Sequence, residues 1–146
     1  MSLQQWAEHG WLRPHRTSRQ EIRDQLAAAA RDLADARGDI SADWRFAIAY
    51  NAALRLCTLL LYASGYEATR EQKHYRTIAA VPLVLGPDAS DLAVFLDGCR
   101  VKRSDVTYES AQAISDAEVE ELLGEVKRLQ RQVRNWLQAS HRDLIG

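Results

Sequence analysis

The sequence predicts an all-α protein, an up-and-down bundle of four to five helices. Apolar residues recur at spacings of three and four along most of the chain, which is the period of a helix with one buried face. Three Ser/Thr-x-x-Glu/Gln capping boxes precede such stretches, and no alternating strand pattern is longer than four residues. With 146 residues, 47% of them apolar, we expect a single domain. Its core is residues 18–140, and residues 1–17 form an N-terminal extension.

In the first half of the chain, the sequence pattern predicts this extension and two helices. Within the extension, the stretch LQQWAEHGWL is typical of a short helix whose two tryptophans pack onto the bundle. A helix follows Ser18, whose hydroxyl and the Glu21 carboxylate would each accept an orphan backbone N–H, and it ends at Gly38. A longer helix, capped by Ser41 and ended by Gly65, has the broad apolar stripe of a central bundle helix.

The second half predicts three further helices. The polar stretch YEATREQKH indicates a connection, and Thr69 with Gln72 matches a capping box for the helix after it. That helix carries HYRTIAAV and stops near Pro82, and GPDAS then indicates a turn. A fourth helix contains DLAVFLDGC. The fifth begins at the box formed by Ser115 and Glu118.

Charge and composition exclude several classes of protein. The net charge of −1 gives no global attraction to nucleic acid or acidic membranes, so such a contact would need a local basic patch. The first residues lack the apolar segment of a signal peptide, and Asn51 and Arg55 interrupt the longest apolar run. Cys57 and Cys99 lie in apolar helical patterns and are expected to be buried and reduced. We therefore expect a soluble, cytoplasmic protein with no membrane contact.

Metal and cofactor motifs are missing from the sequence. The four histidines include no pair at i, i+4 and no Cys/His cluster, so we expect no metal site. The glycines are scattered singly, and neither a P-loop nor a G-x-G-x-x-G motif occurs, so we expect no cofactor. Neither cysteine has a histidine near it in sequence to form a nucleophilic pair.

The stretch CRVKRSDVTY, at the end of the fourth helix, is the candidate site. Arg100 and Arg103 share one side of a helix, whereas Tyr108 lies about 140° further round it. Ser104 and Asp105 compete for backbone hydrogen bonds, so we expect a helical irregularity that brings Arg103 and Tyr108 together. A guanidinium fork and a phenol would then suit a phosphate and a base.

Two residue roles stay open from the sequence. The arginines can instead pair with acids of the last helix, such as Glu118 and Glu121, with Tyr108 packed at the end of the bundle. His74, near the start of the third helix, either hydrogen-bonds the neighbouring loop or faces the same groove as the arginines.

The order of these elements resembles the HEPN (higher eukaryotes and prokaryotes nucleotide-binding) domain family over residues 18–140. The resemblance rests on the long helix RFAIAYNAALRLCTLLLYASGY, on the H-x-x-T-I segment from His74, and on the element formed by Arg100, Arg103, Ser104 and Tyr108. It implies an all-α bundle that forms a homodimer, in which the polar motifs of two subunits meet in one cleft. It also implies a partner such as a small nucleotidyltransferase or an antitoxin.

The resemblance implies two activities. Many members are metal-independent ribonucleases in which four to six residues separate an arginine from a following histidine, and others bind RNA or nucleotides without cleaving them. Here Tyr108 stands where the nuclease motif has histidine, and a phenol is a poor general base at neutral pH. We therefore expect an RNA- or nucleotide-binding domain of a toxin–antitoxin or nucleotidyltransferase-associated system, with Arg100, Arg103, Ser104, Tyr108 and His74 as ligand-binding residues.

Two alternatives remain to this expectation. In a ribonuclease, Arg103 would stabilise the phosphorane charge, and Tyr108 or His74 would carry protons. In a structural protein-interaction module, the arginines would bind no ligand.

Overall fold

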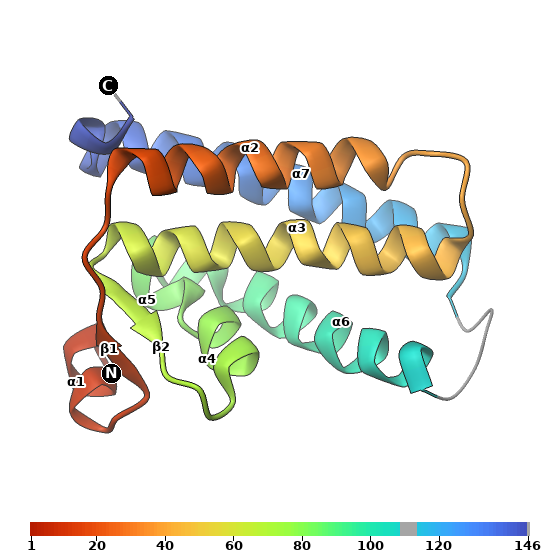
Figure 1. Ribbon diagram of the computed structural model, residues 1–146. Helices are drawn as coiled ribbons and strands as arrows, with labels where there is room; N and C mark the ends of the chain where they lie inside the picture. Colours follow the sequence, from red (N-terminus) through yellow and green to blue (C-terminus); the bar gives the residue numbers. More distant parts are fainter. Residues whose placement is uncertain (109–113, 146) are drawn as a thin grey trace.

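The computed structural model describes residues 1–108 and 114–145, with only the backbone described for residues 105–108. Figure 1 shows an all-α bundle with one very small sheet, which confirms the predicted fold class. The elements are α1 (Leu3–Glu8), β1 (Leu12–Pro14), α2 (Arg19–Asp35), α3 (Ala42–Ala63), β2 (Tyr66–Ala68), α4 (Lys73–Ala79), α5 (Val81–Leu85), the 3₁₀ turn η1 (Pro87–Ala89), α6 (Ser90–Tyr108), α7 (Asp116–Ser140) and the 3₁₀ turn η2 (Arg142–Leu144).

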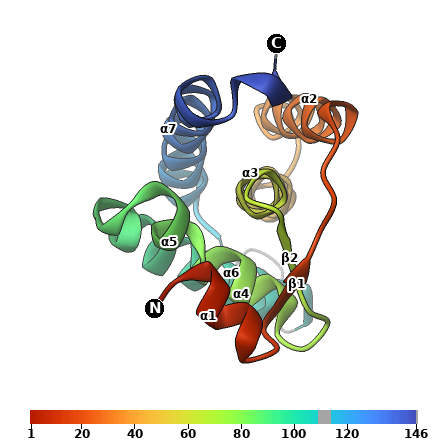
Figure 2. The same ribbon diagram turned by 90° about the vertical axis from the view of Figure 1, so that its left-hand side faces the viewer.

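Helix α3 is the centre of the bundle. Viewed along its axis, it is surrounded by α2 and α7 on one side and by α4, α5 and α6 on the other (Figure 2). Its buried side chains include Phe46, Leu56, Leu59 and Leu60, and the core that they form also takes in Leu122, Leu129 and Val133 of α7. The prediction of a central second helix is confirmed.

Serine caps begin three of the long helices that form this core. The hydroxyls of Ser18, Ser41 and Ser115 each accept a hydrogen bond from a backbone N–H in the first turn of α2, α3 and α7. Each such cap contributes about 1 kcal/mol. The box at Ser115 is complete, whereas the Glu21 carboxylate contacts His15 instead of turning back to its own cap.

The connection after α3 differs from the sequence-based prediction. Residues 66–68 form β2, which pairs antiparallel with β1, although these residues were expected to be a polar connection. The proposed capping box of Thr69 and Gln72 is wrong. The Thr69 hydroxyl donates to the Gly10 carbonyl at 2.8 Å, and Gln72 begins α4 in the left-handed conformation (φ 54°) without a side-chain cap.

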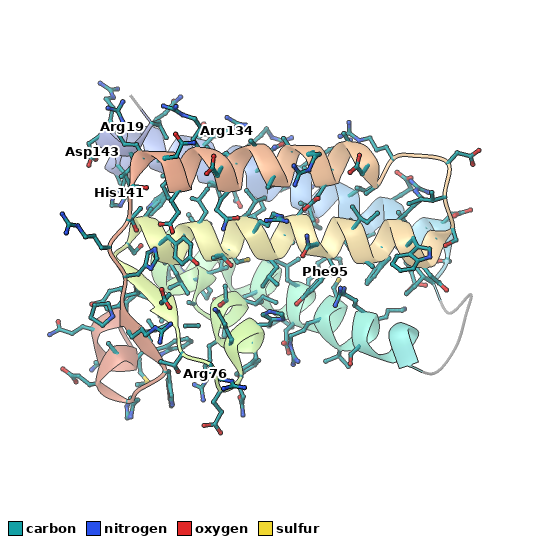
Figure 3. The ribbon with its side chains drawn as sticks, in the orientation of Figure 1. Arg19, Arg76, Phe95, Arg134, His141 and Asp143 are labelled. Carbon is teal, nitrogen blue, oxygen red and sulfur yellow. The ribbon has the colours of Figure 1, made fainter. Side chains whose placement is uncertain are left out.

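The N-terminal extension packs onto the bundle as predicted, with α1 as its short helix. Trp6 joins a small apolar cluster with Leu61 and Ala80, and it meets Trp11 edge to face at 5.5 Å. At the opposite end of the chain, η2 lies near the start of α2, where Figure 3 labels Arg19, Arg134, His141 and Asp143. Both termini therefore lie at the same end of the bundle (Figure 1).

Helix α3 is long and apolar enough, by length and composition, to cross a membrane. The sequence-based expectation was that Asn51 and Arg55 interrupt this run too much for it to span a membrane. By length and composition alone, that expectation is wrong. Both polar side chains have a structural partner, because each donates a hydrogen bond to Oδ2 of the buried Asp32 in α2, at 3.1 and 2.8 Å. Most of the helix is covered by other parts of the bundle.

Candidate functional site

The candidate site lies where α4 packs against α6, near the middle of that helix and beside α3 (Figure 1). Gln72 turns the chain into α4 in a left-handed conformation, and this turn places the next three side chains around an open pocket of about 640 Å³. We call it the cationic pocket. Its described lining consists of Arg70, Gln72, Lys73, His74, Tyr75 and Arg100.

The cationic pocket carries an excess of positive charge. Arg70, Lys73 and Arg100 contribute three cations, and none of the described lining residues carries a carboxylate. Arg100 also has an acidic partner outside the lining, because its Nε donates a hydrogen bond at 2.8 Å to Oδ1 of Asp97, one turn earlier on α6. One acid therefore offsets one cation, and the remaining charge favours an anionic ligand.

His74 lies within this field of cations. Burial, followed by the charges of Arg103, Lys73 and Arg100, lowers the pKa of His74 below its ordinary value of 6.5. The imidazole is therefore neutral at neutral pH and can either donate or accept a proton. Of the two roles left open by the sequence, the structure favours the groove that His74 shares with the arginines.

Tyr50 of α3 lies within reach of the same two arginines. The residue is 2% exposed, and the Arg103 guanidinium carbon lies 5.6 Å from the centre of its ring. Burial raises the pKa of Tyr50 to about 12, against the opposing effect of Arg100 and Arg103. The phenol is therefore protonated at neutral pH, and its hydroxyl has no hydrogen-bond partner among the described residues.

Tyr75 forms one wall of the cationic pocket. Its side chain is 39% exposed, and the guanidinium carbons of Arg76 and Arg100 each lie 5.7 Å from its ring centre. Arg76 has a separate role, because its guanidinium lies 3.7 Å from the ring centre of Trp11 and so links α4 to the N-terminal extension. Figure 3 labels Arg76 at this edge of the molecule.

The structure brings together only part of the predicted site. His74, Arg100 and Arg103 are neighbours, whereas Ser104 is exposed. The helical irregularity expected after Arg103 is wrong, because α6 continues as a helix through Tyr108. The side chain of Tyr108 lies outside the described residues.

The alternative in which the arginines pair with acids of the last helix is not observed for Arg100. Arg100 pairs within its own helix, with Asp97, and Glu118 of α7 pairs with Lys102. The guanidinium of Arg103 lies over the ring of Tyr50.

Sequence reasoning missed Tyr50, Arg70, Lys73 and Tyr75 as members of the site. Lys73 and Tyr75 flank His74 in the stretch KHYR, so a helix that begins at Lys73 would have presented them together. Tyr50 had no such signal, because it occurs within the apolar stripe of α3, where an aromatic residue indicates core packing.

The described residues give little support for metal binding or for cysteine-based catalysis. They contain no group of three His, Cys, Asp or Glu side chains placed to hold a metal ion. Cys57 and Cys99 are buried as predicted, and burial raises the pKa of each thiol to about 12. Such thiols are poor nucleophiles.

The arrangement as a whole can hold a phosphate group. Guanidinium groups bind phosphate oxygens in a fork, a neutral imidazole adds one hydrogen bond, and an exposed phenol ring can stack on a base.

Comparisons of the chain with protein-family models, with curated proteins and with solved structures found no match.

Proposed function

We propose that the protein is an RNA- or nucleotide-binding domain that holds a phosphate in the cationic pocket. One observation supports this proposal most strongly: Arg70, Lys73 and Arg100 surround a neutral His74, with no carboxylate among the described lining residues. Cations that serve only stability are usually paired with acids, as Lys102 is with Glu118. Tyr75 supplies an exposed ring beside these cations, which suits a base attached to the phosphate.

Binding of a short single-stranded RNA, followed by fluorescence anisotropy at low and at moderate salt, tests the proposal. We expect salt-dependent binding that Arg100→Ala weakens about tenfold, because a charge-assisted contact to phosphate is lost. Arg131→Ala is the matched control, since it removes the same charge from an exposed position on α7 outside the pocket. If both variants bind like the wild type, or if Arg100→Ala only lowers the melting temperature, the pocket is structural.

A metal-independent ribonuclease is the second candidate. The observation that favours it is the lowered pKa of His74, because a neutral imidazole beside two guanidinium groups is suited to take the proton of a ribose 2′-OH. Arg103 would then stabilise the charge of the pentavalent phosphorus, and Tyr108 is the second candidate proton carrier.

Cleavage of RNA in the presence of EDTA separates the two candidates. If the protein is a ribonuclease, the wild type cleaves and both His74→Ala and Arg103→Ala are inactive. Intact RNA with retained binding supports the binding domain. Cleavage that persists in both variants would indicate a contaminating nuclease.

We also propose a homodimer that forms through α6, the helix that carries the arginines. Its outward face has an apolar stripe in which Val94, 74% exposed, and Val101, 47% exposed, lie about two helical turns apart with Gly98 between them. A Cβ at Gly98 would meet no atom within 4 Å, so a second helix could approach closely there. Phe95, labelled in Figure 3, borders the stripe.

Sedimentation velocity tests the dimer. The wild type should sediment as a dimer, and Val101→Glu should shift it to a monomer because the new charge would be buried in the contact. A wild-type monomer would rule out the dimer and leave the stripe for a different partner, such as a nucleotidyltransferase or an antitoxin.

A further inference from the structure

The buried hydroxyl of Tyr50 is an unusual feature of the candidate site. Its oxygen is inaccessible to solvent and has no hydrogen-bond partner among the described residues, although the residue is on the central helix of the bundle. Buried polar groups in proteins are nearly always hydrogen-bonded, because an unpaired one loses its contacts with water and gains nothing in return. Phenylalanine would fill the same space without that cost.

The surroundings of Tyr50 indicate what could accept its hydrogen bond. The charges of Arg100 and Arg103 both act on the phenol, and the same two charges act on His74 in the cationic pocket. An anion held by these two arginines would place an oxygen near the phenol. Since the phenol is protonated, it can only help such an anion as a donor.

Access to the hydroxyl depends on a side-chain movement, and Arg103 is suited to make it. Its guanidinium lies over the Tyr50 ring at 5.6 Å, yet the residue is exposed. A long exposed side chain can exchange its present contacts for contacts with an incoming anion. The same movement would grip the anion and open the way to the phenol.

This geometry favours one kind of phosphate. An internal phosphodiester has a ribose on each side and only two free oxygens, so it reaches a buried group less readily than a terminal phosphate, which has three free oxygens and lies at the end of the chain. A terminal phosphate also has a charge close to −2 near neutral pH. It therefore matches the excess of cations better than a single internal phosphate does.

We propose that Tyr50 donates a hydrogen bond to a terminal phosphate held by Arg100 and Arg103, so that the pocket recognises the phosphorylated end of an RNA. This inference rests on the proposed RNA- or nucleotide-binding function and identifies the group that the site selects. Tyr50 is thereby a binding residue that determines specificity.

The test compares three short RNAs of one sequence, with a 5′-phosphate, a 3′-phosphate or hydroxyl groups at both ends. Each competes with an internally labelled RNA for the wild type, for Tyr50→Phe and for Tyr62→Phe. Tyr62, further along α3, serves as the matched control for loss of a phenol hydroxyl. The melting temperature of each variant is measured alongside.

We expect the wild type to bind one phosphorylated RNA about tenfold more tightly than the hydroxyl-ended RNA, which is the size of one hydrogen bond to a charged group. Whichever of the two phosphorylated RNAs binds more tightly shows whether the pocket recognises the 5′ or the 3′ end. Tyr50→Phe should lose this preference, bind the hydroxyl-ended RNA as before and melt no lower than the wild type. Tyr62→Phe should keep the preference.

The following results would overturn the inference. If the wild type binds all three RNAs equally, or if Tyr50→Phe retains the preference, the phenol does not contact the phosphate, and the proposed function stands without it. A Tyr50→Phe variant that melts several degrees lower and keeps the preference would show a structural role. If the wild type binds none of the RNAs, the proposed function fails as well.

Discussion

Two histidines of this protein lie in opposite electrostatic environments. His15, between β1 and α2, contacts two carboxylates: its Nδ1 lies 2.6 Å from Glu67 and its Nε2 2.7 Å from Glu21. Its ring stacks on Tyr62 of α3 at 4.0 Å, and Arg13 also pairs with Glu67. We call this group the His15 junction. His74 instead lies among cations of the cationic pocket.

The two environments shift the pKa values of the two histidines in opposite directions. Burial opposes protonation of His15, but hydrogen bonds and charges from Glu21 and Glu67 outweigh it and raise the pKa of His15 above 6.5. At His74, burial and the charges of Arg103, Lys73 and Arg100 act together and lower the pKa. The junction is thus internally neutralised, whereas the pocket is left with uncompensated charge.

This difference teaches which polar cluster holds the fold and which is available for a ligand. In the junction, every charged group has a partner of opposite sign, and the cluster ties the N-terminal extension to α2, α3 and β2. The pocket instead gathers Arg70, Lys73 and Arg100, whose like charges repel one another in the free protein. Such local repulsion is tolerated where a bound anion relieves it.

Reversing the charge of Arg103, beside the cationic pocket, should have the largest effect on RNA affinity. Arg103→Glu would give His74 a carboxylate like those at His15, so RNA affinity should fall roughly 100-fold and the pKa of His74 should rise. Anisotropy and NMR titration measure the two effects. The control is Arg131→Glu on α7, which makes the same change in net charge. Equal losses of affinity in both variants would mean that only the overall charge matters.

Breaking the junction should affect stability rather than binding. His15→Phe keeps a ring against Tyr62 but leaves Glu21 and Glu67 without their shared partner, which should cost about 1–3 kcal/mol in free energy of unfolding. Chemical denaturation measures this loss, and trypsin should cut sooner at Arg16, which Thr17 follows. RNA affinity should remain unchanged in buffer where the variant is folded. A variant with full stability would show that the junction contributes nothing to the fold.

The pH dependence of stability should separate the two histidines. The raised pKa of His15 gives a contribution that is fully present below pH 6.5 and is lost as the pH rises through its folded-state pKa. Glu67, whose pKa is lowered by Arg13 and His15, contributes above about pH 4.5 and loses that contribution as the pH falls further. The junction is therefore strongest between these limits.

His74 acts with the opposite sign. Because its pKa is lowered in the folded protein, the free energy of unfolding should decrease as the pH falls through 6.5. Denaturation curves from pH 5 to 9 for the wild type, His15→Phe and His74→Phe measure both contributions. Identical profiles for the three proteins would contradict the assigned pKa directions.

The smallest expected effect comes from the rim of the pocket. Lys73→Ala should weaken RNA binding a few-fold and reduce the slope of log affinity against log salt by about 0.7, the value for one phosphate contact with a single strand. Lys127→Ala on α7 is the matched control and should leave the slope unchanged. An unchanged slope in Lys73→Ala would place the phosphate away from α4.

Local signals made most of the fold predictable. The starts of α2, α3 and α7 follow from Ser18, Ser41 and Ser115, because a cap acts within one turn of its own helix. The pairing of β1 with β2 was not predictable in this way. Each strand has three residues, too few for an alternating pattern, and Arg13 meets Glu67 across 54 positions of sequence.

The candidate site was predictable only in part for the same reason. Arg100 and Arg103 form a local cationic motif, and their proximity to His74 was one of two open alternatives. The prediction that Tyr108 lies beside Arg103 assumed a break in α6, and α6 continues as a helix through that residue. Tyr50 is the phenol found beside the arginines, and only the packing of α3 against α6 brings it there.

The most direct test of the phosphate site is an NMR titration of the histidine ring protons, with and without a short RNA that has a phosphorylated end. His74 should shift on binding, and its pKa should rise from below 6.5 because the phosphate offsets the neighbouring cations. His15 should keep its raised pKa, since the junction is already neutralised. If the resonance and pKa of His74 do not change at saturating RNA, the cationic pocket is not where the anion binds.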